Sequence, residues 1–523
     1  MKKIRKMARR FLDIRAFRKD RARFEAFLGT VPREAKFRSN GKRVGILVST
    51  AHYTAIPWYV ITLALLYKFR GFEPCLVFDD IAYADTTRTG DQNRVIGKVL
   101  SKISGDLEVL KLSDFDKSAL NELDAKEIER LCQIYLVARF RSSVPHEGWE
   151  PFREKLRKTL TGNLARVKTL LARQSFDHLV LQGGLWGNTG LFFWAARQMK
   201  LRAATYDSGF GIIFTSIDDI AAHQTDVANI FELKLFGTPD SSVRRKTLEL
   251  ATKELQHRMH GTEKSGGGET VRTETPRFQN TPYCDRPQGT GCDVLMLLNV
   301  DFDAAALGKQ KFFKNPHEWM METTAFVLKN TAATIGVRQH PYERSTPFRA
   351  KHDLRSELER AFPGNSRLRF IPAEENVNTY NLLEAARLVL PLTSTAGVEA
   401  AALGKRVIMA SDSYYSGMSF VDNTLSKEQY FKKIAQRLDS PEPLSQEKKE
   451  DALLCFFAGQ IANRISSSFT PQPADFDRWV KEGFSALLTD ASVQGTLTTW
   501  SEGVPAVVWR MKEILAKEKV ESH

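Results

Sequence analysis

Residues 42–80 read KRVGILVSTAHYTAIPWYVITLALLYKFRGFEPCLVFDD, and this stretch decides the class of fold. The run RVGILV (43–48) is short, apolar and preceded by a glycine turn, which is typical of a buried strand. Residues 58–69 predict a helix that Gly71 ends, and PCLVFDD predicts a second strand. A strand, a helix and a strand so close together form a βαβ unit, so this part of the chain predicts a parallel sheet.

The same alternation continues and then starts afresh in the second half of the chain. In the first half, HLVLQGG (178–184) predicts a strand that enters a glycine-rich loop, and LRAATYDSG (201–209) predicts a strand followed by a turn. After Cys292, further strands are expected over 293–301, 333–341, 388–394 and 406–410. The sequence therefore predicts an α/β protein with two doubly wound, Rossmann-like domains that face a cleft.

Composition shifts along the chain predict five parts. Residues 262–291 are rich in Gly, Pro, Thr and charge, with little apolar periodicity, which is typical of a linker. The predicted parts are a basic amphipathic arm (1–30), a first α/β domain (40–261), the linker (262–291), a second α/β domain (292–425) and a helical segment (426–523). The helical segment could pack back on the first domain.

The charge of the chain is concentrated at its N-terminus. The 523 residues carry a net charge of +14, and residues 1–24 contain eleven Lys/Arg against two Asp. Ile4, Met7, Phe11 and Ile14 recur there at helical spacing among the basic residues, which favours a helix lying on an anionic membrane surface. A solvated basic helix or a disordered tail is the alternative. We expect no nucleic-acid partner, because neither a recognition motif nor a stacking set accompanies the charge.

Other features exclude several classes of protein. The longest apolar stretch (56–67) is too short to span a bilayer. The five cysteines form no C-x-x-C pair, which argues against a zinc ribbon and a disulfide framework. Neither a G-x-G-x-x-G nor a Walker motif follows the first strand. We therefore expect reduced thiols, no cofactor, and a cytoplasmic protein that is peripheral on the inner face of the cytoplasmic membrane.

VRQHPYE (337–343) is the strongest chemical signal. His340 follows a strand, with Arg338 two residues before it. A cation and an imidazole at a strand end can hold a nucleotide phosphate or stabilise a leaving phosphate. A structural loop histidine is the alternative reading.

LPLTSTAGVEAAALGKRVI (390–408) is the second signal. Thr393, Ser394 and Thr395 lie between a strand and a helix, where hydroxyls and backbone N–H groups can bind an anion. An ordinary helix cap is the alternative. Asp301 and Asp303 are spaced like a metal pair, but alternate strand residues face opposite ways, so we expect no metal.

HPYE, then TSTAGVEAAALGKRVI, then SDSYYSGMSF (411–420) resemble, in this order, the bacterial capsule polysaccharide synthesis family, which includes Kdo transferases. The resemblance covers about residues 330–420, and Ser419 stands where a Gly is usual. It implies a GT-B-like glycosyltransferase whose donor nucleotide and phosphate are bound by Arg338, His340, Ser394 and Thr395. By analogy with sugar transferases of this architecture, Glu399 would bind a ribose hydroxyl. Tyr415 and Gly417 would face the sugar.

In the family, a carboxylate in a similar loop of the first domain is catalytic, and the resemblance points to Asp207 in TYDSGFG. A turn-capping Asp is the alternative. His52 ends the first strand, and Gly183 and Gly184 could let the backbone approach an acceptor.

The expected function is transfer of a sugar from a nucleotide donor, with CMP-Kdo as the first candidate, to a lipid-linked or polysaccharide acceptor. A glycerophosphotransferase of the teichoic-acid type, a sugar-nucleotide 2-epimerase and a non-catalytic scaffold of a capsule assembly complex remain alternatives.

Overall fold

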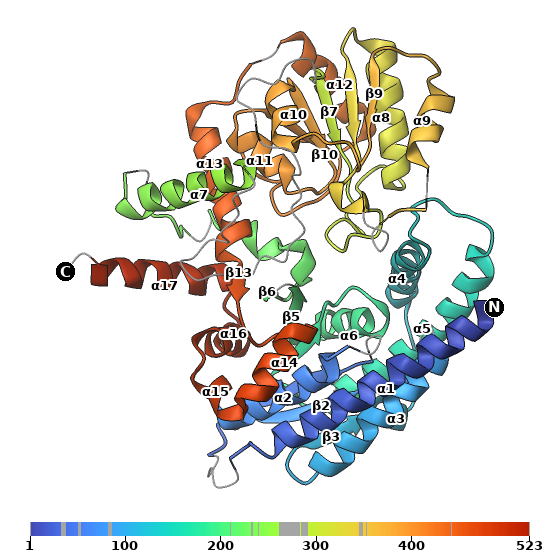
Figure 1. The fold of residues 1–523 in the computed structure, drawn as a ribbon, viewed down its shortest axis with the longest axis vertical. Coiled ribbons are helices and arrows are strands. Elements are labelled where there is room, and N and C mark those ends of the chain that lie inside the picture. The colour runs from blue at the N-terminus through green and yellow to red at the C-terminus, as the bar shows by residue number, and fades with distance from the viewer. Residues whose placement is uncertain are drawn as a thin grey trace. The chain divides into compact units, whose positions relative to one another are not determined.

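A computed structural model gives the fold (Figure 1). The structure describes residues 2–32, 38–50, 54–81, 86–209, 211–231, 234–238, 240–260, 283, 291–344, 349–351, 353–440 and 442–521. His52 and most of the predicted linker 262–291 lie outside the described residues.

The chain divides into two compact units, each built on its own sheet. Unit 1 comprises residues 1–133, 150–222 and 464–509, and unit 2 comprises residues 134–149, 223–463 and 510–523. This division differs from the predicted boundaries, because residues 223–260 belong to unit 2 rather than to the first domain. The predicted α/β class with two doubly wound domains is confirmed.

A seven-stranded sheet forms the centre of unit 1, in the order β13-β6-β5-β4-β1-β2-β3. Its strands are β1 (Arg43–Val48), β2 (Glu73–Phe78), β3 (Glu108–Lys111), β4 (His178–Gln182), β5 (Arg202–Gly209), β6 (Ile212–Ile217) and β13 (Arg464–Ser466). The pairs from β5 to β3 are parallel, whereas β6 pairs antiparallel with both β5 and β13. The C-terminal segment thus completes the sheet of unit 1.

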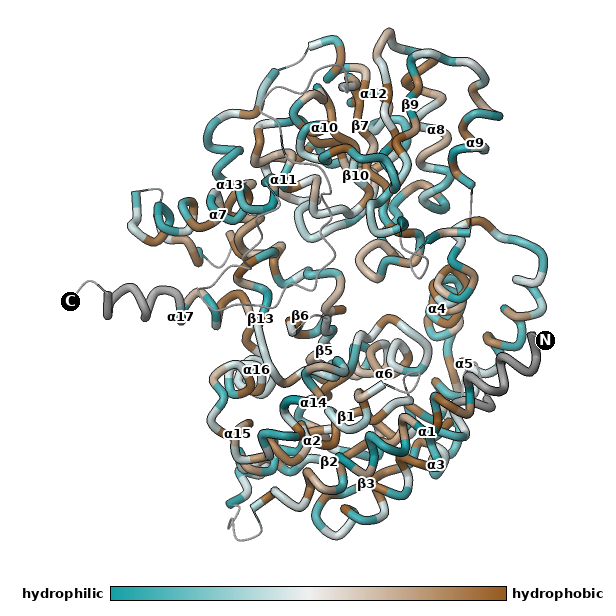
Figure 2. Tube along the Cα trace, in the orientation of Figure 1, coloured by the Kyte–Doolittle hydropathy of each residue, from teal (hydrophilic) through white to brown (hydrophobic). Residues whose placement is uncertain are grey.

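Helices cover the sheet of unit 1, and α2 supplies much of its core. The helices are α1 (Lys2–Leu28), α2 (Ile56–Phe69), α3 (Thr86–Ile103), α4 (Glu122–Phe140), α5 (Trp149–Arg173), α6 (Gly187–Gln198), α14 (Pro473–Glu482), α15 (Phe484–Thr489), α16 (Ala491–Glu502) and α17 (Ala506–Glu521); α4 and α17 extend into unit 2. Every residue from Ile56 to Tyr67 is buried, and Pro57 stands in the first turn, where its missing N–H costs nothing. Figure 2 colours the chain by hydropathy, with the hydrophobic residues in brown.

The N-terminal helix α1 is part of this core, which corrects the prediction of a separate arm. Phe17, Phe24 and Phe27 are each no more than 1% exposed. The rings of Phe17 and Phe24 stack on Trp58 at 5.2 and 5.3 Å, and Phe27 meets Trp479 edge-on at 5.0 Å. The apolar side chains of this half of the helix therefore pack against protein, and only the opposite side of α1 is left for a partner.

Unit 2 has a six-stranded sheet in the order β12-β11-β10-β7-β8-β9, with every pair parallel. Its strands are β7 (Val294–Leu297), β8 (Ile335–Arg338), β9 (Leu368–Ile371), β10 (Leu388–Pro391), β11 (Arg406–Met409) and β12 (Asp422–Asn423). Its helices are α7 (Ser242–His260), α8 (Pro316–Asn330), α9 (Leu354–Ala361), α10 (Thr379–Ala385), α11 (Ala396–Ala402), α12 (Lys427–Asp439) and α13 (Gln446–Phe457). Strands β7, β8 and β10 are buried along their whole length, as expected of a sheet covered on both faces.

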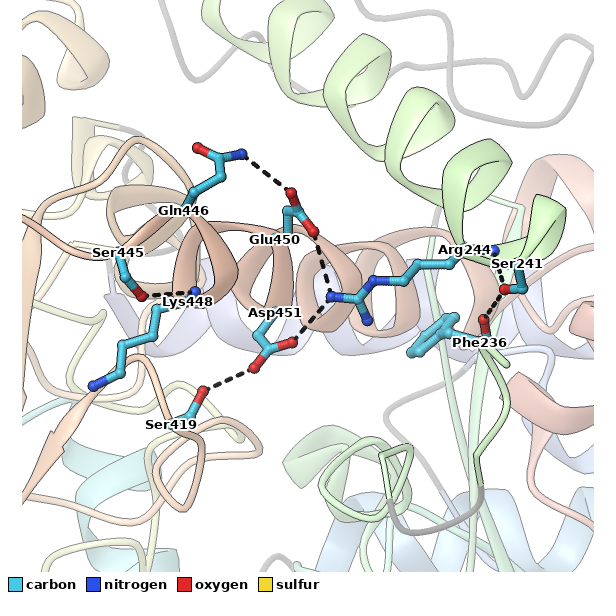
Figure 3. A network of polar contacts seen from close by, with 9 residues as sticks. All are labelled: Phe236, Ser241, Arg244, Ser419, Ser445, Gln446, Lys448, Glu450 and Asp451. Carbon is cyan, nitrogen blue, oxygen red and sulfur yellow. Dashed lines mark hydrogen bonds and ion pairs between the residues drawn. The ribbon is translucent and has the colours of Figure 1, made fainter. Parts of the chain in front are cut away.

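Ion pairs to α13 explain why α7 belongs to unit 2 (Figure 3). Arg244 of α7 lies 3.5 Å from both Glu450 and Asp451 of α13. Asp451 also accepts a hydrogen bond from Ser419, at 2.9 Å. Ser419 is the residue that departs from the family pattern, and its hydroxyl ties the 411–420 loop to α13.

No helix in the described part of the chain is both long and apolar enough to cross a membrane.

Candidate active site

Three loops of unit 2 meet at the carboxyl edge of its sheet, where open α/β sheets bind ligands. They follow β7, β8 and β10, and the topological switch point lies between β7 and β10, because β8 and β9 are added on one side and β10 and β11 on the other. The two motifs that the sequence analysis singled out, VRQHPYE and LPLTSTAG, follow β8 and β10. The predicted donor side is therefore brought to one edge of the sheet.

Asn299 joins the loops on either side of this switch point, and the sequence analysis missed it. Its side-chain oxygen accepts a hydrogen bond from the Thr393 backbone N–H at 3.1 Å. Its Nδ2 donates to Asp303 at 3.0 Å. The polar residues that follow a buried strand in LLNVDFD were the available signal, but only the sheet order places Asn299 next to Thr393.

His340 is held as a neutral hydrogen-bond donor. Its Nδ1 accepts the backbone N–H of Tyr342 at 3.2 Å, so the neutral ring carries its proton on Nε2. Burial lowers the pKa of His340; the nearby Asp303 carboxylate opposes that shift and Arg338 adds to it. A neutral imidazole with its proton on Nε2 can donate to a phosphate oxygen at neutral pH.

Arg338 is only 3% exposed, and it donates to the Pro372 carbonyl. Burial lowers its pKa to about 10, which leaves the guanidinium charged at neutral pH. The burial of Arg338 argues against the predicted contact between its side chain and a phosphate, because a side chain buried at the end of a strand has little surface for a ligand. Together with burial, the positive charge of Arg338 lowers the pKa of His340.

Glu343 anchors the loop that carries His340. It lies in the turn Pro341–Arg344, is 2% exposed, and accepts hydrogen bonds from Gln339 Nε2 at 3.1 Å and the Ala350 N–H at 3.0 Å. Burial raises the pKa of Glu343 to about 7, and the nearby Asp301 carboxylate adds to the shift. The carboxyl group therefore holds the loop in place and does not face solvent.

Three backbone N–H groups in the first turn of α11 already have hydrogen-bond partners within the turn. The Ala396 N–H is bonded to Ser394 Oγ at 3.3 Å, and the N–H groups of Gly397 and Val398 are bonded to the carbonyls of Ser394 and Thr395. These three N–H groups are therefore engaged within the turn, and the binding of an anion by Ser394 and Thr395 stays a prediction. Ser394 and Thr395 are both partly exposed, and the Thr395 hydroxyl makes no cap hydrogen bond, so the hydroxyls are the groups left for a ligand.

Glu399 is engaged by a residue that the sequence analysis did not consider. Arg258 of α7 is 3.0 Å from Glu399 and 3.2 Å from Glu254. Desolvation lowers the pKa of Arg258, but the carboxylates of Glu399 and Glu254, with Tyr380 also contributing, raise it above its usual value. Glu399 is 6% exposed, so the expected contact with a ribose hydroxyl is not supported by its position. The pair instead attaches α11 to α7.

Tyr415 is fully buried, and its hydroxyl donates to the Ser394 carbonyl at 2.6 Å. This corrects the expectation that Tyr415 faces the sugar, because the ring positions the loop behind the site. A Cβ on Gly397 would lie 2.3 Å from the Tyr415 hydroxyl and 2.7 Å from Pro391, so only glycine fits there. Gly417 is exposed, with nothing within 4 Å of the position of a Cβ, and stays a candidate for the ligand side.

Asp207 lies in unit 1, in a strand rather than in a tight loop. Strand β5 continues to Gly209 because β6 pairs with it, and Asp207 stands opposite Phe214. Asp207 is partly exposed, and its Oδ1 accepts the Ser208 N–H at 2.9 Å. Gly183 and Gly184 follow β4 with positive φ of 70° and 78°, a conformation that favours glycine.

Asp79 is a buried carboxyl group at the same edge of unit 1 that the sequence analysis did not single out. It follows β2, is 3% exposed, and accepts a hydrogen bond from Asn188 Nδ2 at 2.8 Å. Asn188 accepts in turn from Asn163 at 2.9 Å. Burial raises the pKa of Asp79 to about 7, more than the Asn188 bond lowers it. The acidic end of PCLVFDD was visible in the sequence, but its burial was not.

The described residues contain no group of three His, Cys, Asp or Glu side chains that could hold a metal ion. The polar groups at the two sheet edges are hydroxyls, an imidazole and carboxylates. Hydroxyls and an imidazole can donate hydrogen bonds to phosphate oxygens, and carboxylates can accept protons.

Comparisons with known proteins report similarity of fold. No protein-family model and no curated protein matches the chain. Solved structures that it resembles include two Kdo transferases from Thermosulfurimonas dismutans KpsC. The β-Kdo 2,4 transferase is 16% identical, over 53% of this chain and 87% of that one, with a TM-score of 0.31. The β-Kdo 2,7 transferase is 15% identical, over 70% and 97%, with a TM-score of 0.32.

A third similar structure is the UDP-GlcNAc 2-epimerase of Neisseria meningitidis, solved with UDP-GlcNAc bound. It is 12% identical, over 80% of this chain and 96% of that one, with a TM-score of 0.24. Identities and scores this low say nothing about substrate or catalytic residues.

Proposed function

We propose that the chain is a glycosyltransferase of capsule-type polysaccharide synthesis, which moves a sugar from a nucleotide donor to a lipid-linked or polysaccharide acceptor. The observation that carries the proposal is the position of the His340 loop and the Ser394–Thr395 loop at one edge of the unit 2 sheet, on either side of the β7 loop, whose Asn299 bonds to Thr393. The order of the three sequence motifs supports a nucleotide-sugar donor, with CMP-Kdo as the first candidate.

In the proposed reaction, unit 2 binds the donor phosphate. The His340 Nε2–H and the hydroxyls of Ser394 and Thr395 donate to phosphate oxygens. As the bond between the anomeric carbon and the phosphate oxygen breaks, negative charge grows on the phosphate, and these donors stabilise it more than they stabilise the intact donor. The buried charge of Arg338 adds to the effect; Asn299 holds the loop that carries Thr393, and Glu343 holds the loop that carries His340.

Unit 1 supplies the carboxylate in this proposal. Asp207 either attacks the anomeric carbon, so that the acceptor hydroxyl later displaces it, or takes the proton of the acceptor hydroxyl directly. In both cases the sugar–phosphate bond is replaced by a sugar–acceptor bond, and the acceptor hydroxyl loses its proton. The acceptor-side assignment of His52, Gly183 and Gly184 stays part of the proposal.

The proposal places the protein in the cytoplasm, peripheral on the inner face of the cytoplasmic membrane, with residues 1–24 toward the anionic lipid. The net positive charge of this segment supports the placement. The burial of Phe17 and Phe24 limits it to the side of α1 that does not pack on the unit.

The first experiment is a thermal-shift screen of the full chain with CMP, CDP, UDP, GDP and ADP. A nucleotide at 100 times its dissociation constant stabilises the bound unit by about 2.7 kcal/mol, which raises its melting temperature measurably. A shift with CMP alone is expected; UDP or GDP would change the donor sugar. No shift with any nucleotide contradicts the proposal and favours a non-catalytic scaffold.

A turnover assay tests the role of His340. His340→Ala is expected to lower turnover about 100-fold or more, since it removes a donor to the leaving phosphate. His317→Ala is the matched control, because His317 pairs with Glu357 on α9 and is not part of the proposed site. Equal rates in the two variants would return His340 to a structural role. Consumption of CDP-glycerol, or epimer formed without an acceptor, would point to the rival enzymes.

A further inference from the structure

Helices α1 and α3 of unit 1 share a cationic face. Figure 1 shows the two helices side by side, and Arg10 of α1 is paired with Asp91 of α3 at 2.5 Å. The described exposed cations of this face are Arg15, Arg18, Lys19, Arg94 and Lys98. In the described part of the chain none of these five has an acidic side chain within ion-pair distance.

Two large apolar side chains stand out among these cations. Phe11 and Leu12 are 64% and 61% exposed, although the other aromatic residues of the described part of α1 are buried. At helical spacing, Phe11, Arg15 and Arg18 fall on one side of α1, facing away from Phe17 and Phe24. Cations with protruding apolar side chains are the pattern of a surface that lies at the boundary between lipid headgroups and acyl chains.

A small cavity opens between the two helices on this face. Its volume is about 70 Å³, and its cationic lining comes from both helices: Arg18 and Arg21 from α1, Arg94 and Lys98 from α3. Ile14 and Val95 line its apolar part. Asp91, the one acidic residue of the lining, is neutralised by Arg10. A cavity of this size with a net positive lining suits a phosphate group.

We propose that the α1–α3 face, defined by Phe11, Leu12, Arg15, Arg18, Lys19, Arg94 and Lys98, docks on an anionic phospholipid surface and seats a lipid phosphate between the helices. The cations of this face complement an anionic partner, and the exposed side chains of Phe11 and Leu12 favour a bilayer over a soluble anion as that partner. This deepens the proposed location and corrects it, since Arg94 and Lys98 of α3 contribute to the face beside five residues of α1. The docking does not depend on the proposed transferase reaction.

Cosedimentation with vesicles tests the proposal on the full-length protein. Arg94→Gln/Lys98→Gln removes two cations from α3 and touches no residue of the basic N-terminus. At about fivefold per cation near an anionic surface, the variant is expected to bind vesicles of phosphatidylglycerol and phosphatidylcholine about 30-fold more weakly. Lys42→Gln/Lys200→Gln is the matched control, because these two exposed lysines line one groove elsewhere on unit 1. It is expected to bind like the wild type.

A second pair of substitutions tests the apolar contribution. Phe11→Ser/Leu12→Ser is expected to lose the binding that remains at high salt, where charge attraction is screened. Truncation of residues 1–24 is not a clean test, because it removes Phe17 and Phe24 from the core.

Three results would overturn the proposal: unchanged binding of the Arg94/Lys98 variant, equal wild-type binding to neutral phosphatidylcholine vesicles, or release from the vesicles by inorganic phosphate alone. Because the readout is binding, a failed transferase assay leaves the result intact, and failed docking leaves the transferase proposal intact.

Discussion

Asp79→Asn should stabilise unit 1, and the gain should grow as the pH rises. Asp79 is 3% exposed at the end of β2, with Asn188 as its side-chain partner. Burial disfavours its charged form and raises its pKa to about 7. An asparagine of the same shape keeps an acceptor for Asn188 and cannot ionise.

The magnitude follows from the difference between the folded and unfolded states. The unfolded carboxyl has a pKa of about 3.9, so the folded protein loses stability as the pH rises from about 4 to about 7, where the unfolded chain releases its proton first. The full loss is about 4 kcal/mol, of which about 2.5 kcal/mol falls between about pH 5 and pH 8. For a unit of this size, that corresponds to roughly 5–10 °C in melting temperature.

The assay is a melting curve of the wild type and the variant at several pH values from about 5 to 8, followed by the circular dichroism of the whole chain. The difference in melting temperature between variant and wild type is expected to widen with pH. Asp106→Asn serves as the matched control for removal of a negative charge, since Asp106 is an exposed residue of the same unit. A constant difference at every pH would refute the reasoning.

Three further predictions concern unit 2 and the acceptor side. Gly397→Ala is expected to cost about 1–3 kcal/mol in urea unfolding by overpacking, whereas Gly417→Ala, in open space, should be near neutral. Arg258→Met should cost about 3–5 kcal/mol by leaving buried carboxylates unpaired, and adding Glu399→Gln should recover part of that loss; no recovery would show that the ion pair is not the cause. Asp207→Asn should abolish sugar transfer while the melting temperature stays unchanged, and a variant that still transfers sugar would move the carboxylate's role elsewhere.

Local patterns were sufficient wherever a segment's own residues decide its structure. The run 43–48, the apolar helix after it and the strands of the second half were predicted from periodicity and glycine turns. The observed strands lie at or within these ranges, and the helix begins two residues earlier than predicted, at Ile56. The loops after β8 and β10 were found because residues at strand ends are polar, and parallel strands place such ends at one edge.

The burial of side chains in those loops depends on groups from other parts of the chain. Tyr415, Glu399 and Arg338 have the residue types of a ligand site, yet the structure covers them with Ser394, Arg258 and the end of β9. Each covering group is between about 20 and 140 positions away along the chain, beyond the reach of any local pattern.

The sequence by itself determined the α/β class, the two sheets and the chemistry available at their edges, because hydrophobic periodicity and turn residues act over a few positions. The tertiary structure decided which of those groups face a ligand. Half of the basic helix α1 is buried against Trp58 and Trp479, and α7 belongs to unit 2, where its Arg244 forms ion pairs with α13. The tertiary structure also joined Asn299 to Thr393 across the switch point. These outcomes depend on contacts between distant segments, whose formation is governed by packing and by the pairing of buried charges.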